Sequence, residues 1–168
     1  FKTEEKNLIV TSVLFALPKV FEPVCSYKEL EAHFAGKSPE SARELEEAVR
    51  AVRARKLPDP KVLPNAGSFF KNPIVTRTKM LALLEETPSL VSYPLGGART
   101  KLAAGWLIEA CGLKGERMGA AGVYENQALV LVNHGGATGA EIKALADEVT
   151  KRVKYRFDVQ LETEPVII

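Results

Sequence analysis

Apolar residues recur along this chain with two different spacings, which predicts a protein that contains both strands and helices. Residues 8–17 are almost all apolar or β-branched, and residues 128–132 form a second run of this kind. We therefore expect a strand over residues 8–17 that is buried on both faces, and a second buried strand over residues 128–132. A further strand is expected from Val159 to Ile168. A strand over residues 8–17 needs a pairing partner, either later in this chain or outside it.

Apolar positions three and four residues apart predict the helices. The expected helices cover residues 26–34, 38–56, 77–84 and 101–110, and a last helix begins at residue 138. Ser38 is a favourable N-cap with Pro39 at the first helical position, and Thr138 with Glu141 forms the pattern of a capping box. This order of elements predicts an α+β fold in which helices pack on a small, mainly antiparallel sheet.

The composition is that of a globular domain, and it argues against several classes of function. The 168 residues include 23 basic and 21 acidic side chains, a net charge of +2, which is too balanced for a nucleic-acid-binding protein. The apolar runs fall short of the roughly 18 residues that a membrane-spanning helix needs. Cys25, Cys111 and the two histidines lack the spacing of metal ligands, so we expect no metal site. Two cysteines do not make a disulfide framework, so we expect a reducing, cytoplasmic environment.

The segment from Leu57 to Pro73 is the main candidate for a functional site. It contains four prolines and is too long for a simple connection. Loops of this length inside a compact domain are usually functional. Ser68 follows Gly67 in this segment, and from the residues alone a turn explains the serine better than catalysis does. A serine hydrolase is not supported, because the chain has no G-x-S-x-G pattern.

Residues 65–73 read Asn-Ala-Gly-Ser-Phe-Phe-Lys-Asn-Pro, and this sequence resembles a signature of the flavin-dependent UDP-N-acetylenolpyruvoylglucosamine reductases. Other parts of the chain resemble the same family in the same order and spacing. They are residues 56–60 (Lys-Leu-Pro-Asp-Pro), 101–108 (Lys-Leu-Ala-Ala-Gly-Trp-Leu-Ile), 111–115, 127–133 and 161–164. The resemblance covers essentially the whole chain.

The resemblance implies a protein of three parts, of which this chain contains only the last portion. Residues 1–20 are expected to be a remnant of the FAD-binding middle domain, and residues 21–168 the C-terminal substrate-binding domain. The N-terminal part that holds most of the FAD, and an arginine near the substrate carboxylate, are expected outside this chain. That missing part of the same protein is therefore the main expected partner.

The implied activity is that of an oxidoreductase of bacterial peptidoglycan synthesis, which serves cell-wall biogenesis, cell shape and cell division. NADPH reduces FAD, and the flavoprotein then reduces the enolpyruvyl group of UDP-N-acetylglucosamine enolpyruvate to give UDP-N-acetylmuramate. The enzyme is expected in the bacterial cytoplasm. The chain by itself is expected to be inactive.

Two residues match the catalytic positions of the family. Ser68 matches the proton donor, and Glu164 matches a second catalytic residue that stabilises the enolic intermediate or orients the substrate carboxylate. Lys71 or backbone N–H groups are expected to stabilise the serine alkoxide. Without the resemblance, Glu162 and Glu164 would be two solvated carboxylates on an edge strand. The family commonly has proline between the two glutamates, whereas this chain has Thr163.

Three residues match positions that bind the UDP group in the family, namely Lys56, Asn72 and Gln127. A lysine supplies a point charge for a diphosphate, and the two amides recognise polar groups of a nucleotide or sugar. The structural alternatives are a cation at a helix C-terminus, a turn asparagine before proline and a surface glutamine.

Two other functions are also compatible with the sequence. One is a nucleotide-sugar-binding module without catalytic activity, which follows if the chain acts without the flavin-binding part. The other is an interaction protein that has lost catalysis, and the presence of both Ser68 and Glu164 argues against it.

Overall fold

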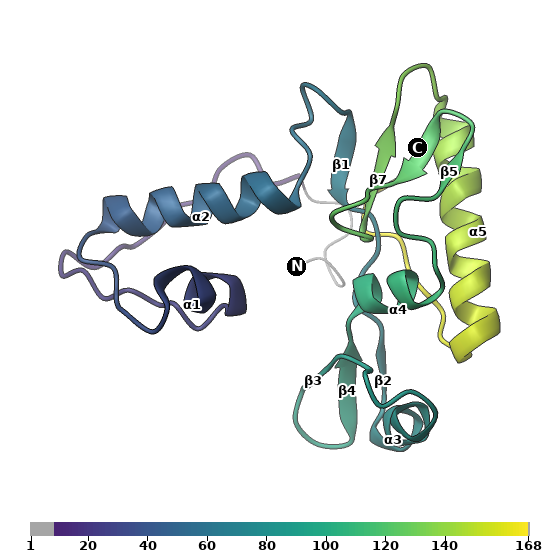
Figure 1. Ribbon diagram of the computed structural model, residues 1–168, viewed down its shortest axis with the longest axis horizontal. Coiled ribbons are helices and arrows are strands. Elements are labelled where there is room, and N and C mark those ends of the chain that lie inside the picture. Colours follow the sequence, from purple (N-terminus) through teal and green to yellow (C-terminus); the bar gives the residue numbers. More distant parts are fainter. Residues whose placement is uncertain (1–8, 168) are drawn as a thin grey trace. The chain divides into compact units, whose positions relative to one another are not determined.

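The computed structural model describes residues 9–167 of the chain. Contacts between residues divide the chain into two compact units, Phe1–Arg50 and Ala51–Ile168. Helix α2 (Ala42–Lys56) runs from the first unit into the second, and each of the other elements lies within one unit (Figure 1). Within the described range, no helix combines the length and the apolar character needed to cross a membrane.

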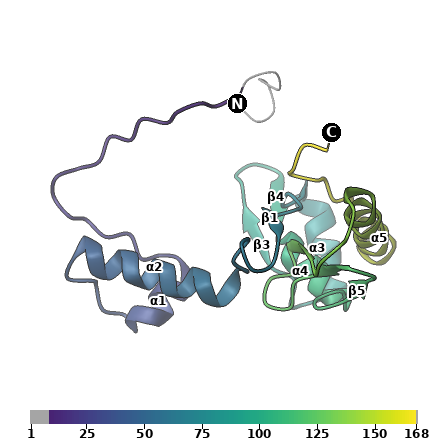
Figure 2. The ribbon, with the colours of Figure 1, turned by 90° about the horizontal axis from the view of Figure 1, so that it is seen from above.

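In the first unit, α1 (Lys28–Phe34) lies alongside the beginning of α2 (Figures 1 and 2). The predicted start of the second helix at residue 38 is wrong, because α2 begins at Ala42. The hydroxyl of Ser41 accepts a hydrogen bond from the backbone N–H of Glu44 (3.2 Å), so Ser41 caps the helix. The helix ends at Lys56, as predicted from the prolines that follow it.

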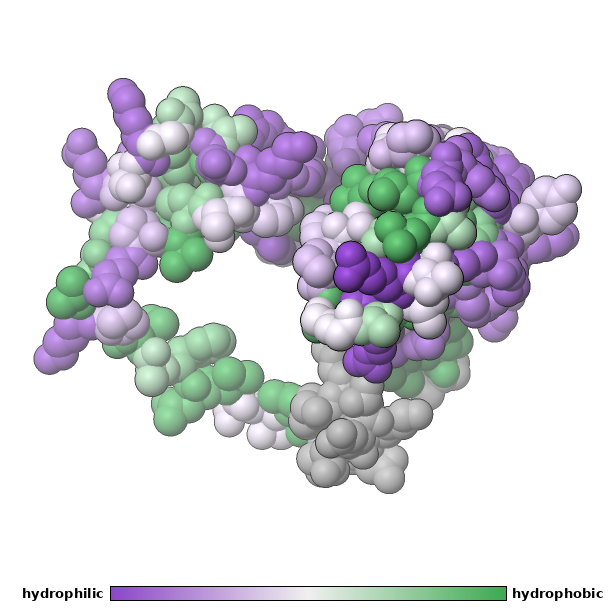
Figure 3. Space-filling model, turned by 90° about the horizontal axis from the view of Figure 1, so that it is seen from below, coloured by the Kyte–Doolittle hydropathy of each residue, from purple (hydrophilic) through white to green (hydrophobic). Residues whose placement is uncertain are grey.

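The prediction of a doubly buried strand over residues 8–17 is wrong for residues 9–17, and residue 8 lies outside the described residues. Residues 9–17 form no strand (Figure 2), and their apolar side chains are exposed, Leu14 by 98%. Figure 3 shows the extended segment mostly in the green of hydrophobic residues. A strand is stable only when its backbone groups bond to a neighbouring strand, and no strand of the described residues pairs with this segment.

The second unit contains a four-stranded antiparallel sheet. Its strands, in spatial order, are β1 (Asn65–Ser68), β7 (Val130–Asn133), β6 (Ala121–Val123) and β5 (Arg117–Met118). Helix α5 (Gly139–Phe157) packs along this sheet (Figure 1). Its inward face consists of apolar residues at helical spacing, namely Leu145, Ala146, Val149, Val153 and Phe157.

A second antiparallel sheet lies next to α3 (Arg77–Glu86) in the same unit (Figure 1). Its strands are β2 (Ile74–Thr76), β4 (Arg99–Leu102) and β3 (Ser92–Pro94), with β4 in the middle. Helix α4 (Ala104–Ala110) follows β4 directly and packs against α5. The predicted α+β class with antiparallel strands is confirmed, although the strands form two small sheets instead of one.

Two predicted boundaries in this unit are wrong. The helix expected over residues 101–110 begins at Ala104, because residues 99–102 pair with β2 and β3 on both sides. The strand expected over Val159–Ile168 does not form over residues 159–167, and residue 168 lies outside the described range. This segment buries Val159 and Leu161 but makes only an isolated bridge between Phe70 and Thr163.

The capping box at the start of α5 forms as predicted. It makes the stability of the fold depend on pH through Glu141. The backbone N–H of Thr138 donates to the Glu141 carboxylate (2.7 Å), and the Thr138 hydroxyl accepts from the Glu141 N–H (3.3 Å). The hydrogen bonds from Thr138 lower the pKa of Glu141 below its ordinary value.

We expect Glu141 to stabilise the fold above its unfolded-state pKa, and this stabilisation to be lost as pH falls through its lower folded-state pKa. Urea denaturation of the wild type and Glu141→Gln between pH 7 and pH 3 measures this difference. The two proteins should differ in stability near neutral pH and converge in acid. A difference that stays constant over this range would contradict the prediction.

Candidate functional site

The loop that leads into β1 is held by the side chain of Asn65. Its amide nitrogen donates to the carbonyl oxygens of Leu63 (2.9 Å) and Pro58 (3.4 Å), and its amide oxygen accepts from the backbone N–H of Gly67 (2.9 Å). Gly67 has a φ of +72°, a conformation that favours glycine over residues with a side chain. This turn brings Ser68 to the end of β1, where its side chain is exposed.

Two buried phenylalanines fix the backbone immediately after Ser68. Phe70 is 1% exposed, and Phe69 packs edge-to-face against it with 5.4 Å between ring centroids. The backbone N–H of Phe69 donates to the carbonyl of Leu129 (2.7 Å), and Ser68 pairs in register with Val130. The serine therefore sits at a solvent-facing position on a backbone that is anchored in the core.

The C-terminal segment runs antiparallel to this stretch and brings Glu164 beside it. The N–H of Lys71 donates to the carbonyl of Glu162 (2.9 Å), and the N–H of Glu164 donates to the carbonyl of Phe69 (2.9 Å). The Lys71 ammonium also lies 3.5 Å from the Glu162 carboxylate. The lysine that was expected to assist Ser68 thus pairs with the chain segment that carries Glu164.

Ser68 and Glu164, which are far apart in the sequence, line one pocket of about 390 Å³ together with Ala66 and Pro165. A hydroxyl and a carboxylate that face one cavity can transfer a proton and hold a polar substrate group. Sequence reasoning did not single out Ala66 and Pro165. Only their nearness in the sequence to Ser68 and Glu164 could have indicated that they line the pocket.

Asn72 and Gln127 each lie near the first turn of α4. The amide oxygen of Asn72 accepts from the N–H of Ala104 (2.9 Å), the first residue of the helix. The amide oxygen of Gln127 accepts from the N–H of Leu129 (3.4 Å) and lies 3.1 Å from the place where a Cβ on Gly105 would be. Since backbone N–H groups occupy both oxygens, each side chain presents its NH₂ group as a hydrogen-bond donor.

Lys56 lies half-buried in the last turn of α2 and does not line the pocket of Ser68 and Glu164. The five predicted site residues therefore occupy three places: the pocket, the start of α4 and the end of α2. Across residues 9–167, no three side chains of histidine, cysteine, aspartate or glutamate gather closely enough to hold a metal ion.

The fold and the site define an α+β domain with a pocket that combines a hydroxyl with a carboxylate, and with two amide side chains near the start of α4. The family model for the C-terminal domain of UDP-N-acetylenolpyruvoylglucosamine reductase matches residues 59–168. The chain belongs to this family and contains its C-terminal domain.

Several curated relatives with the name UDP-N-acetylenolpyruvoylglucosamine reductase are similar to the whole chain. The protein of Polynucleobacter asymbioticus is 52% identical over 168 residues, which are 100% of this chain and 49% of that protein. The protein of Bordetella pertussis is 52% identical over 171 residues, which are 100% of this chain and 48% of that protein. The chain thus spans about half the length of these relatives.

Among solved structures, the crystal structure of UDP-N-acetylenolpyruvylglucosamine reductase from Thermus caldophilus is similar to this chain at 29% sequence identity. The match has a TM-score of 0.42 and covers 73% of this chain and 33% of that structure.

The bonds of Asn65 predict that an Asn65→Ala change destabilises the second unit. Loss of two donated bonds and one accepted bond in a half-buried turn should lower the free energy of unfolding by about 1–3 kcal/mol. Urea denaturation measures this loss. Asn126→Ala, which removes one exposed bond to Tyr124, serves as the control and should change stability little. Equal losses in the two variants would refute the structural role of Asn65.

Proposed function

We propose that this chain is the substrate-binding part of a reductase that converts UDP-N-acetylglucosamine enolpyruvate to UDP-N-acetylmuramate, an oxidoreductase step in making peptidoglycan precursors. The observation that carries this proposal is the shared pocket of Ser68 and Glu164. Membership of the reductase family supports it, and so does the name of the relatives. The bacterial cytoplasm is the proposed location.

Reduction of an enolpyruvyl group requires a hydride at its terminal carbon and a proton at the neighbouring carbon. FAD, reduced by NADPH, supplies the hydride chemistry when it is bound. The pocket of about 390 Å³ has the size for a small polar group. We place most of the FAD-binding residues in the other half of the full-length protein, as the family resemblance implies.

In this proposal Ser68 donates the proton to the carbon that acquires carbanion character. The hydroxyl stands at the end of an anchored strand, so it can be held close to one substrate atom without a large loss of conformational entropy on binding. Glu164 faces the same cavity from the opposite segment, where it orients the acid group or stabilises the enolic form.

The UDP group is proposed to bind through Lys56, Asn72 and Gln127. The two amides present NH₂ donors, which suit the acceptor oxygens of a phosphate or a uracil carbonyl. Lys56 contributes a positive charge from the end of α2, where a cation also stabilises the helix dipole. A donor-rich site selects an acceptor-rich ligand such as a nucleotide diphosphate.

We also propose that residues 1–20 belong to the FAD-binding middle domain and residues 21–168 to the substrate-binding domain. The exposed apolar side chains of residues 9–17 support this division, because such a segment needs a covering partner. Strands of the flavin-binding part would bury it and satisfy its backbone groups.

A second candidate function is a nucleotide-sugar-binding module without catalytic activity. It is favoured by the amide donors of Asn72 and Gln127, which lie within the chain. Under this alternative, the chain by itself binds the UDP-sugar and performs no reduction.

A Ser68→Ala change in the full-length protein should separate the two half-reactions. Reduction of the flavin by NADPH should stay unchanged, whereas reduction of the enolpyruvyl substrate should slow by roughly 10²–10⁴-fold, because a positioned proton donor is lost. Stopped-flow absorbance of the flavin measures both steps. Ser89→Ala, in an exposed turn, serves as the control. Equal slowing of the two steps would overturn the role of Ser68.

An Asn72→Asp change should separate ligand binding from folding. The carboxylate still accepts the hydrogen bond from Ala104 and suits a helix N-terminus, so the free energy of unfolding should change little. Binding of UDP-N-acetylglucosamine should weaken by about tenfold or more, because a donor is replaced by a negative charge near the diphosphate.

Calorimetric titration of the chain and of the full-length protein measures this binding, with N-acetylglucosamine as the ligand control and Asn126→Asp as the variant control. Unchanged affinity in Asn72→Asp would remove Asn72 from the UDP site. Saturable binding by the chain that requires the UDP group would support the donor site whether or not catalysis is observed.

A further inference from the structure

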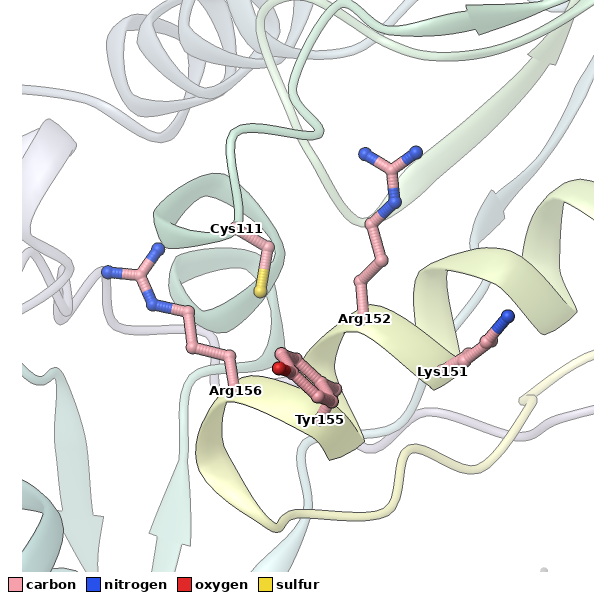
Figure 4. A pocket seen from close by; sticks show the side chains of 5 residues that line it. All are labelled: Cys111, Lys151, Arg152, Tyr155 and Arg156. Atoms are coloured by element: carbon pink, nitrogen blue, oxygen red, sulfur yellow. The ribbon is translucent and has the colours of Figure 1, made fainter.

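A second pocket, of about 390 Å³, lies between the end of α4 and the last turns of α5 (Figure 4). It shares no residue with the pocket of Ser68 and Glu164. Its lining residues are Cys111, Lys151, Arg152, Tyr155 and Arg156. Four of these come from one helix, and Figure 4 shows the Cys111 side chain pointing from α4 toward the ring of Tyr155.

The walls of this pocket are mainly carbon, although most of its residues are polar or charged. The aromatic ring of Tyr155 and the aliphatic stems of the cations form these walls. Figure 4 shows the charged ends of Lys151, Arg152 and Arg156 pointing outward in different directions around the ring. Tyr155 is 93% exposed, so no fold contact explains an aromatic residue at this position. The hollow therefore offers an apolar surface to a flat group.

The charge at the rim is positive and only partly compensated. Arg152 is paired with Glu148 (2.8 Å) and Glu116 (3.0 Å). The Arg156 guanidinium instead has two neutral partners, the carbonyl of Ala110 and the ring of Phe157 at 5.1 Å from its centroid.

Lys151 makes no ion pair with any residue from 9 to 167. The pKa of Glu148 is lowered by its hydrogen bond from Arg152 and also by the nearby charge of Lys151, so Lys151 is partly compensated. Arg156 makes no ion pair among the described residues. The positive charge around the apolar hollow is therefore only partly neutralised, and such an arrangement attracts an anion.

The thiol of Cys111 adds no negative charge to this pocket. Burial raises its pKa above the ordinary value, and this effect outweighs the opposite influence of Arg156 and Arg152. The side chain is therefore a neutral, polarisable part of the wall at neutral pH.

We propose that this pocket is a second ligand site, which binds a small aromatic anion such as an aryl carboxylate. The aromatic body packs on Tyr155 and the stems of the cations, and the acid group interacts with one of the cationic side chains around the ring. The pocket volume lies in the usual range for small-molecule sites. This site goes beyond the proposed reductase function and does not depend on it.

The test uses 2-naphthoate as the probe and the neutral 2-naphthamide as the matched control ligand. In a titration of the ¹⁵N-labelled chain followed by NMR, 2-naphthoate should shift the amide signals of Cys111, Gly112 and residues 151–157 in a saturable manner. The amide should bind several-fold more weakly. No saturable shift in these residues, equal affinity for the two compounds, or shifts confined to residues 9–24 would overturn the proposal.

Two exposed side chains allow variants that leave the fold unchanged. Tyr155→Ala should weaken binding of 2-naphthoate by roughly tenfold through the lost stacking surface. Lys151→Gln should weaken it by roughly three- to fivefold through the lost charge. Lys143→Gln, on the same helix and paired with Asp147, is the control and should bind as the wild type does. Wild-type affinity in both test variants would overturn the assignment.

Discussion

The backbone pairing of residues 69–71 with residues 162–164 is the constraint on which the candidate site depends. Two hydrogen bonds of 2.9 Å and the bridge between Phe70 and Thr163 join a loop in the first half of the second unit to the end of the chain. Because Phe70 is buried, this pairing is tied to the core. Ser68 and Glu164 line one pocket only as long as this pairing holds.

Helix α4 fixes the separation between the amide side chains of Asn72 and Gln127 and the second pocket. Its first N–H group donates to Asn72, Gln127 lies close to Gly105 in its first turn, and its last carbonyl accepts the hydrogen bond from Arg156. Leu107 and Ile108 between these ends are fully buried. At about 1.5 Å per residue, seven residues place the donor site and the second pocket roughly 10 Å apart along one helix. The short helix α4 therefore connects the amide donors at its start with the second pocket at its end.

The exposed apolar segment of residues 9–17 contrasts with the second unit, whose apolar side chains form a core. Its side chains are those of a buried strand, yet they face solvent in this chain. Under the proposed domain division, this segment packs against the flavin-binding part of the full-length protein.

The sequence by itself determined the local features of this protein. The capping box of Thr138 and Glu141, the end of α2 before Pro58 and the apolar face of α5 formed as predicted, since each depends on residues within one or two helical turns. The family, too, could be identified from short blocks of sequence, and the comparisons confirmed it.

Only the tertiary structure decided which segments become strands and which residues meet. Residues 9–17 have strand composition but pair with no strand of the described residues. Residues 101 and 102 were expected in a helix but lie in β4, which pairs with strands on both sides. Composition does not reveal whether a partner exists, because strand formation requires backbone hydrogen bonds from residues distant in the sequence. For the same reason, the shared pocket of Ser68 and Glu164 and the common position of Asn72 and Gln127 follow from long-range pairing.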